Sequence, residues 1–80
     1  MGKKTFRFDI IFARKFGEKI KKLRTDKSIT QEELAFRANI SPSYMSAIER
    51  GITDTTISTA KRIAKALDVD IRALFDFYAL

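Results

Sequence analysis

Residues 30–51 of this 80-residue chain read TQEELAFRANISPSYMSAIERG, and this stretch decides the fold. Thr30 and Glu33 have the spacing of a capping box, in which each side chain bonds the other residue's amide at a helix start. Asn39 stands where a left-handed residue ends a helix, and asparagine tolerates that conformation next best after glycine. The Ser-Pro pair at 41–42 starts a second helix, since serine caps and proline suits the first helical position. We therefore predict two short helices joined by a tight turn.

The apolar side chains of this stretch recur every three or four residues, as on the buried face of a helix. They are Leu34, Ala35 and Ala38 in the first helix, Ile40 in the turn, and Met45 and Ile48 in the second. Ala35 is small, which the crossing of two helices at that point requires. Two helices fixed in this way present the second to the DNA major groove, about 12 Å wide. The stretch from Thr30 to Arg50 is thus predicted to be a helix-turn-helix motif.

Outside this stretch, apolar spacing predicts three more helices. The first runs from Asp9 or Ile10 to Asp26 and buries Phe12, Phe16, Ile20 and Leu23. Another follows a cap at Thr55 or Thr56 and has as inward residues Ile57, Ala60, Ile63, Ala64 and Leu67. Asp70 caps a last short helix that contains Ile71, Leu74 and Phe75. The one proline and the three glycines are expected at boundaries between elements. The whole chain, 1–80, is predicted to be one all-α domain with its core in 12–75.

The sequence of residues 1–8 does not decide the conformation of this segment. Phe6, Phe8 and Ile10 alternate with polar residues, which fits a short strand as well as an extended arm or a helix. A basic and aromatic arm can touch DNA. We favour the alternative, in which these phenylalanines pack on the core or on a partner subunit.

Charge and composition narrow the function. The net charge is +6, and residues 1–27 alone hold ten Lys or Arg against three acidic residues, a surplus of +7. Such asymmetry suits an anionic partner such as nucleic acid. The chain has no cysteine and no histidine, which removes thiolate metal sites and the commonest catalytic base. We expect no enzyme, metal, cofactor or small-molecule ligand, no export or membrane segment, and a cytoplasmic location.

Five short motifs follow one another along the chain. They are FGEKI at 16–20, LR at 23–24, ITQEELA at 29–35, ISPSYMS at 40–46 with IERG at 48–51, and IAKAL at 63–67. In this order they closely resemble the Xre-type helix-turn-helix family, which includes the phage lambda repressor and Cro proteins and short regulators such as restriction-modification controller proteins. The resemblance covers residues 16–75. The sequence departs from the family pattern at Asn39, where glycine is common, and at Thr55, where proline is common.

The resemblance implies a five-helix, lambda-repressor-like domain that binds operator DNA as a symmetric dimer. The helix at 42–50 would enter the major groove, and half-sites would lie about one helical turn apart. Carried over position by position, Ser43, Tyr44 and Ala47 fall where relatives touch base edges. Gln31 falls where the preceding helix holds a phosphate, and Arg50 falls near the backbone.

The side chains themselves support the same face. Tyr44 and Ala47 offer apolar contact to thymine methyl groups, serine hydroxyls suit several bases, and Arg50 can form a bidentate contact with guanine. The predicted DNA-binding residues are Gln31, Ser41, Ser43, Tyr44, Ser46, Ala47 and Arg50. Each has a structural alternative, and for Glu49 an ion pair inside the domain is favoured over contact with cytosine.

The C-terminal end carries more apolar surface than one small core absorbs, and we predict that it forms a dimer contact. The residues are Leu74, Phe75, Phe77, Tyr78 and Leu80. The predicted function is a sequence-specific DNA-binding transcriptional regulator that acts as a homodimer on a palindromic operator. An antitoxin-like or other protein-interaction module, with DNA binding secondary, is the alternative.

Overall fold

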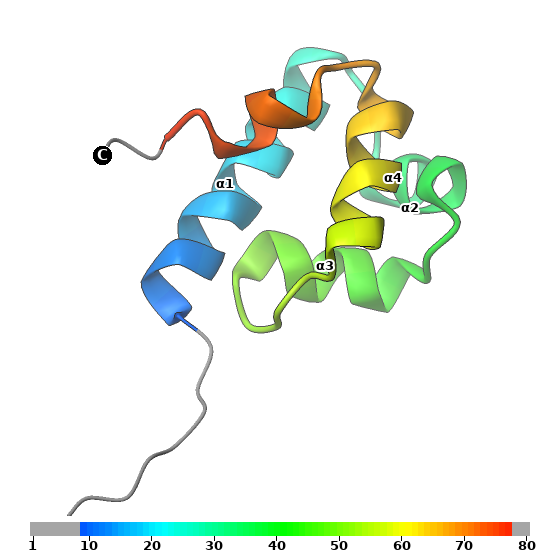
Figure 1. The fold of residues 1–80 in the computed structure, drawn as a ribbon. Coiled ribbons are helices and arrows are strands. Elements are labelled where there is room, and N and C mark those ends of the chain that lie inside the picture. The colour runs from blue at the N-terminus through cyan, green and yellow to red at the C-terminus, as the bar shows by residue number, and fades with distance from the viewer. Residues whose placement is uncertain (1–8, 78–80) are drawn as a thin grey trace, which may run out of the picture.

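The computed structural model describes residues 9–77, which form four α-helices and one 3-10 helix (Figure 1). The helices are α1 (Ile10–Asp26), α2 (Gln31–Ala38), α3 (Pro42–Arg50), α4 (Ile57–Leu67) and η1 (Ile71–Phe75). The predicted all-α class is confirmed. Of the five predicted helices, the last is a single short 3-10 segment. The predicted N-terminal arm lies outside the described residues.

Each α-helix begins at a side chain that accepts a hydrogen bond from a backbone amide of its first turn. The caps are Asp9, Thr30, Ser41 and Thr56. The Thr30 hydroxyl accepts from the amide of Glu33 at 3.0 Å, which is one half of the predicted capping box. The Glu33 carboxylate accepts from Arg37 at 2.9 Å. Such caps satisfy amides that the helix itself leaves unpaired.

Each α-helix also ends in the same way, with a left-handed residue followed by an aliphatic one. The left-handed residues are Ser28, Asn39, Gly51 and Asp68, with φ between 57° and 72°. In α2, the amide of Ile40 donates to the carbonyl of Ala35 at 3.0 Å, five residues back. This Schellman bond turns the chain sharply and points the following aliphatic side chain toward the helix it has just left. The predicted role of Asn39 is confirmed.

One core joins all the helices. Its fully buried large side chains are Ile20, Leu34, Met45, Ile48, Ile63, Leu67 and Leu74. The predicted inward faces of α2 and α3 are confirmed. The prediction for Ile57 was wrong, because its side chain is 87% exposed. Ile57 directly follows the Thr56 cap, and the buried register of α4 starts only at Thr59 and Ala60.

Gly17 lies in the middle of α1, so the prediction that every glycine marks a boundary was also wrong. A Cβ atom at this position would stand 2.2 Å from the carbonyl oxygen of Ile48 and 2.6 Å from that of Glu49. Both atoms belong to the backbone, so they cannot move away without distorting the end of α3. Gly51, at the end of α3, is similarly close to the backbone of Arg14. The two glycines let α1 touch the last turn of α3 at backbone distance.

The C-terminal segment packs onto α1 through aromatic rings. The ring of Phe75 lies 5.1 Å from that of Phe16, and the ring of Phe77 lies 5.2 Å from that of Phe12. Offset and tilted ring pairs at such distances stabilise a fold beyond simple burial. Leu74 and Phe77, two of the five residues predicted for a dimer contact, are therefore buried or half-buried within one chain.

Replacing Gly17 with alanine tests the α1–α3 contact. In an open helix this change stabilises a protein by about 0.5–1 kcal/mol, because alanine is the better helix former. Here the new methyl group meets carbonyl oxygens, so we expect the free energy of unfolding to fall by about 1–3 kcal/mol. Urea unfolding gives the sign directly, with the exposed Lys21→Ala as a control in the same helix. A stabilised Gly17→Ala protein would contradict the close contact.

Candidate nucleic-acid interface

The helix α3 lies along one side of the molecule, with α1, α2 and α4 behind it (Figure 1). Its buried face is Met45, Ile48 and Glu49. Ser43 and Arg50 are exposed, and Tyr44, Ser46 and Ala47 are half-buried on the outward side. The predicted base-contacting residues therefore lie together on one helix face. A short helix with a polar, outward face of this size fits a major groove.

Hydrogen bonds already fix several of these side chains. The Ser41 hydroxyl caps α3 by accepting from the amide of Tyr44 at 3.1 Å. The Tyr44 hydroxyl donates to the carbonyl of Asp54 at 3.4 Å, which ties α3 to the loop that follows it. The Nε of Arg50 donates to the Ser46 hydroxyl at 3.2 Å. Ser41 and Ser46 thus have structural partners, and the Ser43 hydroxyl lies 3.5 Å from that of Ser41. Ala47 presents only a methyl group.

A buried ion pair holds α3 from behind. Arg24 of α1 donates from Nε and Nη2 to the two carboxylate oxygens of Glu49, at 2.7 and 3.0 Å. The side chains are only 11% and 3% exposed. The hydrogen bond from Arg24 to Glu49 raises the pKa of Arg24 above its ordinary value, although burial works in the opposite direction. This confirms the ion-pair interpretation of Glu49.

Gln31 joins the same network. Its Nε2 donates to Glu49 at 3.0 Å, while Arg24 also donates to the carbonyl of Ile29 at 2.9 Å. One carboxylate of α3 is therefore bound from α1 and from the first residue of α2. The amides at a helix start are natural seats for a phosphate oxygen. The network fixes the start of α2 relative to the outward face of α3.

Within residues 9–77, no three His, Cys, Asp or Glu side chains come together to hold a metal ion. No helix in that range is long and apolar enough to cross a bilayer.

Residues 20–74 match the family model described as helix-turn-helix, which is more than half of the chain. The chain belongs to the helix-turn-helix family. This confirms the Xre-type resemblance. Control protein C.BamHI of Bacillus amyloliquefaciens is 40% identical over 63 residues, or 78% of each chain. The immunity repressor protein of Bacillus phage phi105 is 38% identical over 72% of this chain and 40% of its own.

A solved helix-turn-helix structure shows the same architecture. The restriction-modification controller protein C.AhdI from Aeromonas hydrophila superposes with a TM-score of 0.78 at 38% identity. The match covers 79% of this chain and 96% of C.AhdI. This chain therefore shares its fold with C.AhdI over nearly the whole length of C.AhdI.

Two contributors to this site were not predicted as such. Arg24 was noted only as part of a family motif, and Gly17 was expected at a boundary. Arg24 acts through its pairing with Glu49, 25 positions later, and Gly17 through the close approach of the α3 backbone. No local sequence pattern reveals either contact. Ile57, one residue after its cap, was assigned to the core by helical spacing alone.

Replacing Glu49 with alanine leaves the Arg24 guanidinium buried without its carboxylate. We expect the free energy of unfolding to fall by about 3–5 kcal/mol, because an unpaired buried charge destabilises the folded state. Glu49→Gln, which keeps an acceptor oxygen, should lose less. The matched control is Glu33→Ala, which breaks the exposed pair with Arg37 and should cost no more than about 0.5 kcal/mol. Equal midpoints for both alanine variants in urea unfolding would contradict the importance of the buried pair.

Proposed function

We propose that the protein is a sequence-specific DNA-binding regulator of transcription that acts as a homodimer on a palindromic operator. In this proposal α3 enters the major groove and the start of α2 lies on the sugar-phosphate backbone. The observation that carries it is the outward face of α3, held rigidly by the Arg24–Glu49 pair and by the Gly17 contact. The protein would act in the cytoplasm on double-stranded DNA, without catalysis of its own.

The roles of the outward residues follow from what each side chain offers. Ser43 and Ala47 face out with small groups, and the Tyr44 ring can lie against a thymine methyl group. Arg50 is exposed at the end of α3 and can bind a guanine or a phosphate. Gln31 would act mainly through its backbone amide, because its side-chain nitrogen bonds Glu49. Ser41 and Ser46 would act chiefly by shaping the helix start and placing Arg50.

The similarity to C.BamHI and C.AhdI supports a regulator of the controller type. The match to C.AhdI includes 96% of that chain, so it extends beyond the motif itself. The basic N-terminal third adds general attraction to the DNA backbone, which is independent of sequence. No observation on the described residues favours an antitoxin-like role.

The dimer surface lies on the side of the molecule where α1, the start of α4 and η1 meet. A groove there is lined by apolar side chains, among them Phe12, Phe16, Ile57, Ala60 and Phe75, and at its polar part by Asp9 and residues 53–56. Ile57 projects from its edge and is 87% exposed. Of the residues predicted for this contact, Leu74 is fully buried in the core and Phe77 packs on α1, while Tyr78 and Leu80 lie outside the described residues. We propose that Ile57 and Phe75 form its centre.

Selection of bound duplexes from a random pool tests DNA binding, symmetry and half-site spacing together. We expect a palindrome with half-sites about 34 Å, or one turn, apart. The Ser43→Ala, Tyr44→Ala protein should relax the preference at the bases that α3 contacts. It should unfold at a somewhat lower midpoint, because Tyr44 packs on the core and bonds Asp54, and should remain folded under the binding conditions. Lys65→Ala, on the exposed side of α4, is the control. An unaltered preference in the double variant would mean that another face contacts the bases.

Replacing Ile57 with glutamate tests the dimer surface. The change places two carboxylates in an apolar contact related by two-fold symmetry, so the dimer dissociation constant should rise at least about 100-fold. Folding should be unaffected, because glutamate is favourable in the first turn of a helix. Sedimentation velocity measures the effect, and Ser58→Glu, one residue further on, is the matched control. A dimer that survives Ile57→Glu unchanged would place the contact elsewhere.

A further inference from the structure

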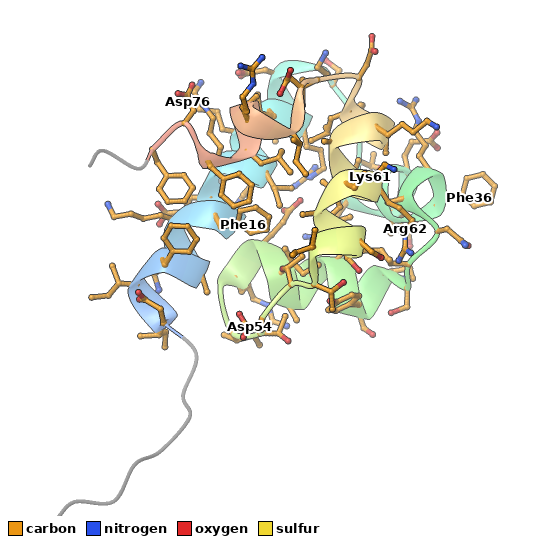
Figure 2. The ribbon with its side chains drawn as sticks, viewed as in Figure 1. Phe16, Phe36, Asp54, Lys61, Arg62 and Asp76 are labelled. Atoms are coloured by element: carbon orange, nitrogen blue, oxygen red, sulfur yellow. The ribbon has the colours of Figure 1, made fainter. Side chains whose placement is uncertain are left out.

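The groove beside Ile57 has the size and the lining to hold an aromatic ring. Its volume is about 250 Å³, and its apolar side chains come from α1, α4 and η1. An apolar cavity of about 150 Å³ is large enough to bind benzene. Figure 2 shows Phe16 on the side of α1 that faces α4, with Asp54 on the loop below it. A phenyl ring can therefore fit between α1 and α4.

The chain carries two such rings directly before the groove. Asp9 lines the groove and is the N-cap of α1, so the chain enters this helix at the groove's edge. Phe8 directly precedes Asp9, and Phe6 is three residues away from it, a distance of at most about 11 Å. Residues two apart in an extended segment share a face, so both rings can turn to the same side. Both are within reach of the groove.

The start of α1 favours a return of the chain toward the groove. A hydrophobic residue directly before an N-cap often packs on the fourth residue of the helix, an arrangement called the hydrophobic staple. Here these two residues are Phe8 and Ala13, and Ala13 belongs to the lining of the groove. A staple at this point directs the preceding residues along the groove. Because the pairing is local, it points to the chain's own segment as the occupant.

The rim of the groove is acidic, although the chain as a whole is basic. Asp9 and Asp54 lie on this rim, and neither forms an ion pair with another residue of the range 9–77. Residues 1–8 carry no negative charge and three positive ones, at Lys3, Lys4 and Arg7. Charges of opposite sign attract within a Debye length of about 10 Å. The segment that precedes α1 thus matches the groove in charge as well as in apolar character.

We propose that residues 5–8 lie in this groove of their own chain, with the ring of Phe8 against Ala13 and the ring of Phe6 further along, and that the filled groove forms part of the dimer surface. The second half of the proposal rests on the proposed function, because it uses the homodimer joined at Ile57. A filled groove makes the apolar surface continuous with Ile57, and the core of a dimer contact is both apolar and closely packed. The cations of the segment also reduce the repulsion between two acidic rims that meet about a two-fold axis.

Nuclear Overhauser contacts test the occupant directly. We expect them between the ring protons of Phe8 and the methyl group of Ala13, and between the ring of Phe6 and the methyl group of Ala60, which also lines the groove. A sample mixed from isotope-labelled and unlabelled chains separates contacts within one chain from contacts between two chains. Absence of these contacts, or contacts that arise only between chains, would overturn the proposal.

Replacing both rings tests the contribution to the dimer. The Phe6→Ser, Phe8→Ser protein loses the rings and keeps the three cations. Its dimer dissociation constant, measured by sedimentation velocity, should rise about 10-fold, because apolar area is removed from the contact. The matched control is Ile10→Ser, Ile11→Ser, which removes two exposed apolar side chains outside the groove and should leave the constant unchanged. Equal constants for the two variants would overturn the proposal.

Operator binding separates this role from a contact between the segment and DNA. At concentrations where both proteins are dimeric, the variant without the rings should bind the selected operator with unchanged affinity and salt dependence. Weaker binding with an unchanged dimer dissociation constant would assign the segment to DNA and overturn the proposal. If the unaltered protein bound no operator, the proposed function would fail, whereas the Overhauser contacts would still decide whether the segment fills the groove.

Discussion

The bidentate pair of Arg24 and Glu49 is the interaction on which the remaining structure depends. It joins the last turn of α1 to the last turn of α3, and Gln31 adds the start of α2. A buried pair of this kind contributes less net stability than its geometry suggests, because both charges lose their water. The pair also constrains the orientation of the helices, because its hydrogen bonds join α1, α2 and α3 at one carboxylate. The orientation of α3 is therefore determined by partners behind it.

Three separate surfaces result from this arrangement. The outward side of α3 is small and polar, the groove beside Ile57 is largely apolar, and the outer side of α2 exposes the ring of Phe36. Each surface draws its residues chiefly from a different helix. A change in one can therefore leave the others intact, so single substitutions can test each surface by itself.

The local structure could be predicted from sequence almost completely, and the long-range structure only partly. Caps such as Thr30 and helix ends such as Asn39 depend on a few neighbouring residues, so their patterns suffice. The prediction for Gly17 was wrong because the backbone that requires a glycine there belongs to α3, about 30 residues later in the sequence. The prediction for Ile57 was wrong because helical spacing identifies a face without showing whether the first position on it meets a neighbour. On the candidate site, the outward set was predictable, whereas the partners of Gln31 and Glu49 required coordinates.

The ends of the helices have a consequence for binding. Three of the four left-handed positions carry a side chain, at Ser28, Asn39 and Asp68, and only Gly51 is a glycine. A residue with a Cβ has fewer backbone states available when unfolded than glycine has, and the Schellman bonds close each turn. The connections between helices are thus short and stiff. The recognition surface meets its target already ordered, so association loses little conformational entropy and more of the contact energy remains as affinity.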